Sequence, residues 1–457
     1  MSHKFFAAQT VFLFGLLFFA LFSFFWGCPA LWAGRAVSGL AARSALRGLR
    51  PLGRAFGPPC PSLSRVAALL LAAPPFLVQN SNLMSIAINA RFLLKNKLEG
   101  IGWYSFEILK RWVEQHPEEE FVFFFDRPYD PQFVFGPNVT PVVLGPPARH
   151  PILFYLWFEW SLPAAFKKYD CDRFFSPDGF LSLRANIPTL LVIHDIAWKH
   201  FPDLVPWAHR KHYEYFMPKF IAAAQKIATV SNYSQDDILA QFPAAENKTF
   251  YSYNGCHQSY QPLAEIEQQA IREKYADGQA YFLYLGSIHP RKNMLRLLQA
   301  FEDFKAQTNS PILLLIAGRL AWQNDELKSY LDQMKYRSSV RLLGYLPQEE
   351  LPKVLGAAYA LLYVSLFEGF GLPLLEAAAA GVPALGANTS SMPEVVGEAG
   401  LLADPYSVAD ISAQMQRLVQ DKALYQKLKA ATAQQASRFS WQTAANELWT
   451  ALMSLKA

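Results

Sequence analysis

The stretch Ser365-Leu-Phe-Glu-Gly-Phe-Gly-Leu-Pro-Leu-Leu-Glu376 directly follows a short apolar run at 360–364, and it decides the fold class. An apolar run of that length is typical of a buried strand, and Pro373 suits the first turn of the helix that comes next. Gly369 and Gly371 allow the backbone to approach a ligand closely. Since the first turn of a helix offers free amides and the positive end of its dipole, this unit predicts a phosphate site in an α/β protein.

Strand and helix patterns alternate along the rest of the chain, in two series separated by a polar, turn-rich passage near 255–265. This alternation predicts parallel sheets covered by helices. The expected strands are 86–89, 121–125, 173–176, 189–194 and 226–230 in the first series and 281–285, 312–317, 341–343 and 360–364 in the second. Two such halves predict two Rossmann-like domains that face each other across a cleft, where ligands commonly bind.

Composition and charge narrow the classes of function. The chain of 457 residues is 52% hydrophobic and 17% charged, which excludes a disordered, collagen-like or coiled-coil protein. The net charge is +5, but residues 1–83 carry +7 and no acid, so residues 84–457 carry −2 and give no support to nucleic-acid binding. Four widely spaced cysteines predict neither a disulfide framework nor a zinc site.

The first 83 residues differ in composition from the rest and form an apolar, arginine-rich leader. Residues 5–26 are mostly apolar and long enough to cross a bilayer as a helix. Six arginines follow this run and only Lys4 precedes it, so the positive-inside rule would leave the remaining chain in the cytoplasm. However, the leader contains no Asp, Glu, Ile or Tyr, and a strand pattern begins at Met84. Two interpretations stay open: a transmembrane anchor, or a mis-extended start before a functional chain that begins at Met84.

The spacing of Glu368 and Glu376 resembles the E-x7-E signature of the family 4 retaining glycosyltransferases (glycosyl transferases group 1), which have the two-domain GT-B fold. Four further segments are similar to landmarks of that family: Tyr284-Leu-Gly-Ser-Ile-His-Pro-Arg-Lys-Asn293, Gly344-Tyr-Leu-Pro347, Ser391-Met-Pro-Glu-Val-Val-Gly-Glu-Ala399 and Ala228-Thr-Val-Ser-Asn-Tyr-Ser-Gln-Asp-Asp237. The resemblance extends over about residues 84–457. It implies an acceptor domain at 84–262, a nucleotide-sugar domain at 263–435, and a C-terminal helix within 436–457 that packs back on the first domain.

The resemblance also implies roles for residues in the second half. Arg291 and Lys292 would bind the donor diphosphate, because negative charge grows on the leaving phosphate during transfer. Glu376 would hold the ribose hydroxyls. Glu368 would hold the hydroxyls of the donor hexose and belong to the catalytic set. The residues that would present backbone amides to phosphate and sugar are Gly369, Phe370, Gly371 and Leu372.

Three positions of the first half are considered for the same site. His194 and Asp195 come at the end of the strand expected at 189–194, on the sheet edge where α/β sites collect. A neighbouring His and Asp often form a structural hydrogen bond. A histidine at the matching strand end of the family faces the donor sugar, which implies a catalytic-site role for His194 and leaves Asp195 ambiguous. Gly102, in a Gly-x-Gly loop, is similar to the family's glycine that approaches the donor phosphates.

The same glycine motif keeps an oxidoreductase open as an alternative. Gly100-Ile-Gly-Trp-Tyr-Ser105 approaches a dinucleotide fingerprint, and Asp126 follows the next strand as a ribose-binding acid would. Against an NAD-dependent enzyme, Ser105 replaces the third glycine, and roughly ten residues separate the preceding strand from the motif, whereas the fingerprint turn follows its strand immediately.

A second motif raises the question of a metal. Asp170-Cys-Asp172 resembles the metal-binding DxD of the other glycosyltransferase fold class, although a turn before the short strand at 173–176 also explains it. The helix dipole together with Arg291 and Lys292 would replace the cation that DxD enzymes require. We therefore expect neither a metal nor another cofactor.

The sequence predicts an enzyme of polysaccharide biosynthesis that moves a hexose from a nucleoside diphosphate sugar to a hydroxyl of a glycan or lipid-linked acceptor. The segment Ala317-Gly-Arg-Leu-Ala-Trp-Gln-Asn324 resembles the mannosyltransferase-like branch, which favours GDP-mannose over UDP-sugars as donor. A sugar-nucleotide-binding protein without turnover is a further alternative. The expected location is the cytoplasm, with membrane association if residues 5–26 anchor the chain.

Overall fold

The computed structural model describes residues 84–95, 98–319 and 325–456. The leader lies outside the described residues, and so do both interpretations of it, the transmembrane segment at 5–26 and the mis-extended start. Most of the mannosyltransferase-like segment, residues 320–324, is also outside them. Within the described residues, no helix combines the length and the apolar character that a bilayer crossing requires.

The first half of the described chain is built on a seven-stranded sheet with the order β3-β2-β1-β4-β5-β6-β7. Its strands are β1 (Ser85–Asn89), β2 (Glu120–Phe125), β3 (Val139–Val143), β4 (Arg173–Ser176), β5 (Thr189–Val192), β6 (Lys226–Thr229) and β7 (Thr249–Tyr251). The helices of this half are α2 (Gly100–Gln115), α3 (Pro151–Leu156), α4 (Leu162–Lys168), α5 (Ala197–His200), α6 (Trp207–Ala223) and α7 (Asn232–Gln241). Strands β1 and β5 are buried throughout, as expected for strands covered on both faces.

The second half repeats this plan with a six-stranded sheet of order β10-β9-β8-β11-β12-β13. Its strands are β8 (Tyr281–Leu285), β9 (Leu313–Ala317), β10 (Val340–Gly344), β11 (Ala360–Tyr363), β12 (Ala384–Ala387) and β13 (Gly400–Ala403). The helices are α8 (Glu265–Ala276), α9 (Met294–Thr308), α10 (Asp325–Gln333), α11 (Leu351–Gly356), α12 (Leu372–Ala379), α13 (Met392–Val396), α14 (Val408–Gln420) and α15 (Lys422–Ser437). Every strand pairing in the two sheets is parallel, as the alternating pattern predicts.

The strand order places the functional loops. In each sheet the chain starts in the middle, builds toward one edge, and then returns to build the other, so the order reverses between β1 and β4 and between β8 and β11. Ligands of open α/β sheets bind outside the carboxyl ends of the strands at such a switch point. The loops after β8 and β11 contain the cation pair and the glycine motif, so both lie at this edge of the second sheet.

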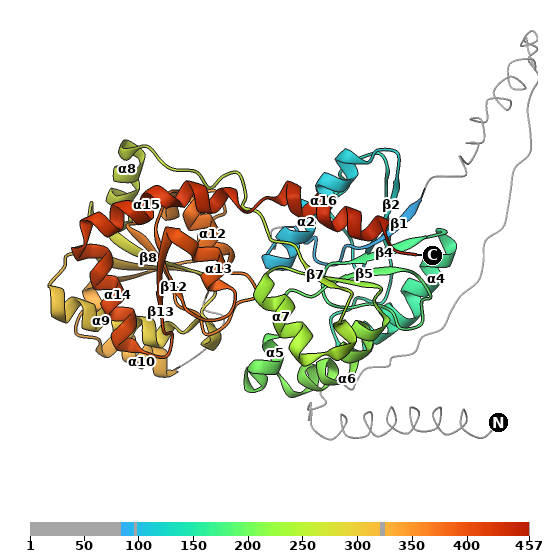
Figure 1. Cartoon of the computed structure of the whole chain (residues 1–457), viewed down its shortest axis with the longest axis horizontal. Coiled ribbons are helices and arrows are strands. Elements are labelled where there is room, and N and C mark those ends of the chain that lie inside the picture. Colours follow the sequence, from blue (N-terminus) through green and yellow to red (C-terminus); the bar gives the residue numbers. More distant parts are fainter. Residues whose placement is uncertain (1–83, 96–97, 320–324, 457) are drawn as a thin grey trace, which may run out of the picture. The chain divides into compact units, whose positions relative to one another are not determined.

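The last helix, α16 (Trp441–Met453), packs against the first half of the chain. Figure 1 shows it (red) beside α2 (blue), and the indole Nε1 of Trp112 donates a hydrogen bond of 2.8 Å to the Ala445 carbonyl. The segment that joins the two sheets contacts the start of this helix at Gly255. A Cβ there would lie 2.2 Å from the Trp441 amide nitrogen, so only glycine fits.

Two local expectations are wrong. The expected Gly-x-Gly loop does not exist, because α2 begins at Gly100 and Gly102 lies in its first turn. The strand expected at 189–194 ends at Val192, so His194 belongs to the loop that follows. The first pattern predicts a loop where a helix begins, and the second gives the correct strand but misplaces its end.

Candidate functional site

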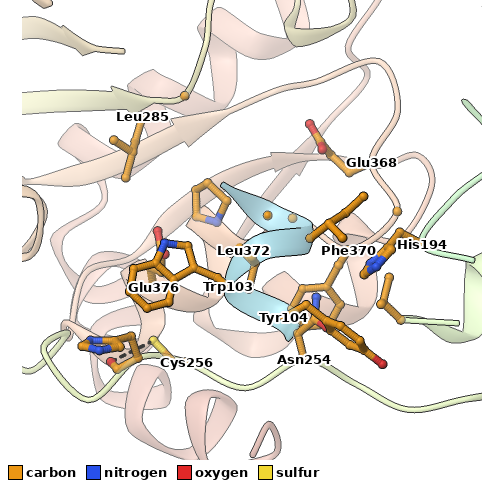
Figure 2. A pocket seen from close by; sticks show the side chains of 18 of the residues that line it. Trp103, Tyr104, His194, Asn254, Cys256, Leu285, Glu368, Phe370, Leu372 and Glu376 are labelled. Carbon is orange, nitrogen blue, oxygen red and sulfur yellow. Dashed lines mark hydrogen bonds between the residues drawn. The ribbon is translucent and has the colours of Figure 1, made fainter. Parts of the chain in front are cut away.

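A pocket of about 540 Å³ lies at the carboxyl ends of the strands, and residues from both halves line it. Figure 2 shows His194 and Phe370 toward one end, Glu376 and Trp103 toward the other, and Leu372 between them. We call this cavity the first pocket. Of the ten residues that the sequence assigns to the site, its lining includes nine: His194, Arg291, Lys292, Glu368, Gly369, Phe370, Gly371, Leu372 and Glu376.

Gly102 is not among the lining residues. Its neighbours Ile101 and Trp103 face the pocket, whereas a Cβ on Gly102 would approach the Phe92 carbonyl oxygen to 2.9 Å. The glycine therefore serves the close approach of α2 to the loop after β1, and the expected contact with donor phosphates gains no geometric support.

Lys292 and Glu368 form a pair that the sequence does not reveal. The Lys292 Nζ lies 2.6 Å from Glu368 Oε1 and 2.6 Å from the Tyr363 hydroxyl, with which it also hydrogen-bonds. The two charged side chains are only 14% and 8% exposed. Burial acts to raise the pKa of the Glu368 carboxyl, but the charges of Lys292 and Arg291 outweigh burial and lower that pKa. Glu368 is therefore ionised at neutral pH and held in one orientation.

Arg291 is the second cation at this end. It precedes α9 in the short 3₁₀ turn Pro290–Lys292, and its Nη1 donates a 3.0 Å hydrogen bond to the Phe367 carbonyl. The same nitrogen lies 3.8 Å from Asp195 Oδ2, on the opposite half of the chain. Burial acts to lower the pKa of the guanidinium, but the charges of Glu368 and Asp195 raise it. Arg291 thus remains charged and carries a fork of donors suited to phosphate.

Hydroxyl groups fix the glycine loop between β11 and α12. Ser391 Oγ lies 2.9 Å from the carbonyl oxygens of both Glu368 and Phe370, and Ser231 Oγ donates a 2.6 Å hydrogen bond to the Gly369 carbonyl. A Cβ on Gly369 would lie 2.5 Å from the His194 carbonyl oxygen, so glycine is required there. Gly371 has a φ of 98° and precedes the first residue of α12. Because side chains bind the three carbonyls, the loop is held rigidly at the start of the helix.

Glu376 lies on α12 at the other end of the pocket. The side chain is partly buried and hydrogen-bonds with Tyr260. Burial raises the pKa of this carboxyl to about 7, although the Tyr260 bond acts in the opposite direction. Glu376 therefore exchanges a proton near neutrality, and a ligand that prefers the carboxylate will bind more tightly as the pH rises through this range.

His194 contributes a neutral imidazole at the end of the first pocket near Phe370. Its Nε2 lies 2.8 Å from the Pro177 carbonyl oxygen, and the Tyr104 ring meets it edge-on at 4.8 Å. Burial lowers the pKa of His194 in spite of the bond to Pro177. In the neutral tautomer that this bond selects, Nε2 donates to Pro177 and Nδ1 is an acceptor.

The acidic residues of the dinucleotide-like motif and of the DxD-like motif lie outside the first pocket and have structural roles. The Asp126 carboxylate accepts two 2.6 Å hydrogen bonds from Arg127 and one of 2.9 Å from the Ala148 amide, so it is engaged within its own loop. Asp170 lies in a turn, and Asp172 accepts a 2.8 Å hydrogen bond from the Ser85 amide at the start of β1, away from the carboxyl ends of the strands. Within the part of the chain that the structure describes, no three His, Cys, Asp or Glu residues are grouped to hold a metal.

Sequence reasoning missed several residues of the first pocket. Tyr363 accepts a hydrogen bond from Lys292 and interacts with Glu368, Tyr260 interacts with Glu376, and Ser231 binds the glycine loop from the opposite half. Tyr363 ends a buried strand and reads as a core residue, so no local signal distinguishes it. Ser231 lies in a segment that resembles a family landmark, which is a signal for the region and not for its contact.

Two family models match the chain. One, described as glycosyl transferases group 1, matches residues 266–435, and one described as glycosyltransferase family 4 matches residues 98–259. The O-antigen chain mannosyltransferase B of Escherichia coli is 31% identical over 360 residues, which are 76% of this chain and 94% of that protein. The serotype-specific mannosyltransferase WbdA of Escherichia coli is 27% identical over 278 residues, 57% of this chain and 33% of that protein.

Solved structures show the same fold at lower identity. A glycosyltransferase from Rickettsia africae superposes with a TM-score of 0.63 at 15% identity, over 82% of this chain and 99% of that one. Anabaena Alr3699/HepE, solved with UDP and glucose, gives 0.61 at 17% identity, over 82% of this chain and all (100%) of that one. These likenesses establish the arrangement of two Rossmann-like sheets.

Proposed function

The chain belongs to the group 1, family 4 glycosyltransferases and is a transferase, and from this premise we propose that it moves a mannosyl group with retention of anomeric configuration. The proposed donor is a nucleoside diphosphate sugar, GDP-mannose before UDP-sugars. The proposed acceptor is a hydroxyl of a growing glycan, free or lipid-linked, as in the synthesis of a bacterial surface polysaccharide.

One observation supports the proposal most strongly: the first pocket combines the cations Arg291 and Lys292, the N-terminus of α12 and two glutamates. Of these glutamates, one has a lowered pKa and stays ionised, whereas the other has a pKa raised to about 7. The cations and helix amides suit a diphosphate. Glu368, kept ionised by Lys292, is a fixed acceptor for hexose hydroxyls. In this proposal Glu376, at the opposite end of the pocket, accepts hydrogen bonds from ribose hydroxyls. A nucleoside diphosphate sugar has these groups in this order.

The choice of mannose rests on the relatives. The protein that is 31% identical over most of this chain is an O-antigen chain mannosyltransferase, and WbdA is also a mannosyltransferase. The resemblance of the segment Ala317–Asn324 to the mannosyltransferase-like branch agrees with them.

The proposed step breaks the bond between the hexose C1 and the diphosphate oxygen and forms a bond between C1 and the acceptor oxygen. The acceptor proton leaves with the nucleoside diphosphate. Arg291 and the amides at the start of α12 stabilise the negative charge that grows on the departing diphosphate.

The proposed donor also bears on location. Because nucleotide sugars are made in the cytoplasm, we propose that the enzyme works on the cytoplasmic side.

A donor panel tests the proposal. We expect transfer from GDP-mannose to a mannoside acceptor, with slower or no transfer from UDP-glucose, UDP-galactose or ADP-glucose, and an α-linked product in the NMR spectrum. A β-linked product would contradict retention. Tight donor binding without turnover on mannosides, glucosides or galactosides would favour the non-catalytic sugar-nucleotide-binding alternative.

Metal independence is a separate prediction. Because Arg291, Lys292 and the α12 dipole supply positive charge to the diphosphate, EDTA is expected to leave the initial rate of transfer unchanged. The assay compares enzyme in EDTA with enzyme in added Mn²⁺ or Mg²⁺. Loss of transfer in EDTA that Mn²⁺ restores would mean that a cation takes part.

A further inference from the structure

Helix α7 of the first half begins against the second half. Its first two residues, Asn232 and Tyr233, donate their backbone N–H groups to the two carboxylate oxygens of Glu394 on α13, at 3.1 Å each. The Tyr253 hydroxyl donates a third hydrogen bond, of 2.9 Å, to the same carboxylate. The first amides of a helix have no partner within the helix, and a carboxylate also suits the positive end of its dipole. Glu394 therefore caps α7 from the opposite half of the chain.

The same end of α7 binds the glycine loop. Ser231, the N-cap of α7, accepts a 3.0 Å hydrogen bond from the Ser234 amide and donates one of 2.6 Å to the Gly369 carbonyl. The Ser234 hydroxyl donates a second bond, of 3.0 Å, to that carbonyl. Gly369 lines the first pocket. A displacement of α7 would thus remove two hydroxyl donors from the loop.

An aromatic contact joins α7 to the residue before Glu368. The Phe367 side chain is only 4% exposed. Three rings of the first half contact it, those of His200, Phe201 and Tyr233, at centroid distances of 5.1, 6.1 and 5.8 Å. Because Tyr233 is the second residue of α7, the helix start contacts the loop on both sides of Glu368.

Helix α13 is fixed to α15 and to the same loop. Gln435 of α15 donates hydrogen bonds of 3.1 and 3.0 Å to the carbonyls of Glu394 and Val395. Ser391, directly before α13, hydrogen-bonds to the carbonyls on both sides of Gly369. Because Glu394 lies on this short helix, its contact with α7 ties the first half of the chain to the glycine loop.

We propose, building on the proposed function, that Glu394 is a positioning residue for the transfer. Its carboxylate holds the start of α7 against the second half, so that Ser231 and Ser234 fix the Gly369 carbonyl. The loop amides then need no rearrangement when charge grows on the diphosphate. Glu394 is not among the residues that line the first pocket, so it acts through α7 and not on the donor.

The first test measures hydrogen exchange in the full chain without a ligand. Glu394→Gln keeps one acceptor oxygen but loses the charge and the second oxygen. We expect the amides at 232–233 and 366–368 to exchange about tenfold faster, as for the loss of a hydrogen bond to a charged group. The second range reports on the loop, because the Glu368 amide donates a 3.0 Å hydrogen bond to the Ser390 hydroxyl.

Glu398→Gln is the matched control, because Glu398 is exposed and lies two residues after α13; it should exchange as the wild type does. If Glu394→Gln does not fold, Tyr253→Phe is the milder variant. It removes one donor to the carboxylate but keeps the ring that packs 5.1 Å from that of Phe439, and should speed exchange about threefold. Unchanged exchange at 366–368 in the folded variants, or faster exchange confined to α13, would overturn the proposal.

The second test measures turnover. We expect Glu394→Gln to lower kcat for transfer from GDP-mannose about tenfold and to leave KM for the acceptor unchanged. Since Glu394 and Ser231 act through the same contacts, the double variant with Ser231→Ala should lose less than the product of the two single losses. A full product, or a wild-type kcat in Glu394→Gln, would overturn the positioning role. A wild-type enzyme that transfers from no donor would instead refute the proposed function, and the exchange test would still decide whether Glu394 holds the loop.

Discussion

Replacing Arg291 by alanine is expected to lower kcat by about a hundredfold or more, because in the proposed reaction its guanidinium meets charge that grows on the leaving diphosphate. This factor corresponds to about 2.7 kcal/mol of lost transition-state stabilisation. The neighbouring acids Glu368 and Asp195 raise the pKa of Arg291, so the charge is present throughout the working pH range. Steady-state rates with saturating donor would measure the effect.

Arg291 Nη1 also donates a hydrogen bond to the Phe367 carbonyl, so the substitution could lower kcat by disturbing the loop before α12. Two further variants separate this effect from the loss of charge at the diphosphate. Arg291→Lys keeps the charge but loses the fork, and should fall between wild type and Arg291→Ala. Arg417→Ala removes an exposed arginine of α14 whose guanidinium donates a hydrogen bond to Gln414, and it should leave kcat unchanged. Near-normal turnover in a folded Arg291→Ala protein would refute the assignment of this residue to the donor phosphates.

The sequence is sufficient to predict most of the architecture. The family, the transferase class and the GT-B fold with two parallel sheets are confirmed. The prediction succeeds because strands buried on both faces are continuous apolar runs, as in β8 (YFLYL) and β5 (TLLV), which differ clearly from the amphipathic helices between them. The apolar leader has no such test, because it lies outside the described residues.

Four strands, β3, β7, β12 and β13, are not among those expected from the sequence, and the first three show why. Strand β3 (VTPVV) contains a proline and lies at a sheet edge, where the missing amide is tolerated. Strand β12 (ALGA) has one large apolar residue among three small ones, so it does not stand out as an apolar run, although the structure buries all four residues. Strand β7 has only three residues. In each case tertiary pairing, and not local propensity, makes the strand.

For the site too, local features can be predicted from the sequence and long-range contacts cannot. Motif residues such as Glu368 and Gly369 can be located from the sequence, because they lie in one short segment in which a strand, a loop and a helix follow one another. The contacts Lys292 to Glu368 and Arg291 to Asp195 join residues that are far apart in the sequence, so no local pattern contains them. The roles of all these residues in binding and catalysis stay predictions until they are tested by substitution.

Glu376→Gln is expected to have opposite effects on stability and on donor binding. Burial raises the pKa of this carboxyl from 4.5 to about 7. A group whose pKa is raised on folding contributes stability that is present below pH 4.5 and lost as the pH rises through about 7. At higher pH the folded protein without ligand therefore contains an ionised, partly buried glutamate, at a cost of at most about 3 kcal/mol. The neutral amide removes this cost and should raise the melting temperature at pH 8 but not at pH 4.5.

The same substitution should reduce turnover by about a hundredfold and weaken binding of GDP, because in the proposed complex ribose hydroxyls donate to the carboxylate and would donate less well to an amide. In the wild type, GDP affinity should fall about tenfold for each pH unit below 7, since binding must first remove the proton. Cys256 and Tyr260 also face Glu376, but burial raises the pKa of both, so neither titrates here. Calorimetric titration with GDP from pH 5.5 to 8 should show this slope in the wild type and in the exposed control Glu398→Gln. Glu376→Gln should keep only the smaller slope that the terminal phosphate of GDP contributes by its own ionisation. A slope as steep as that of the wild type would place the titrating group elsewhere.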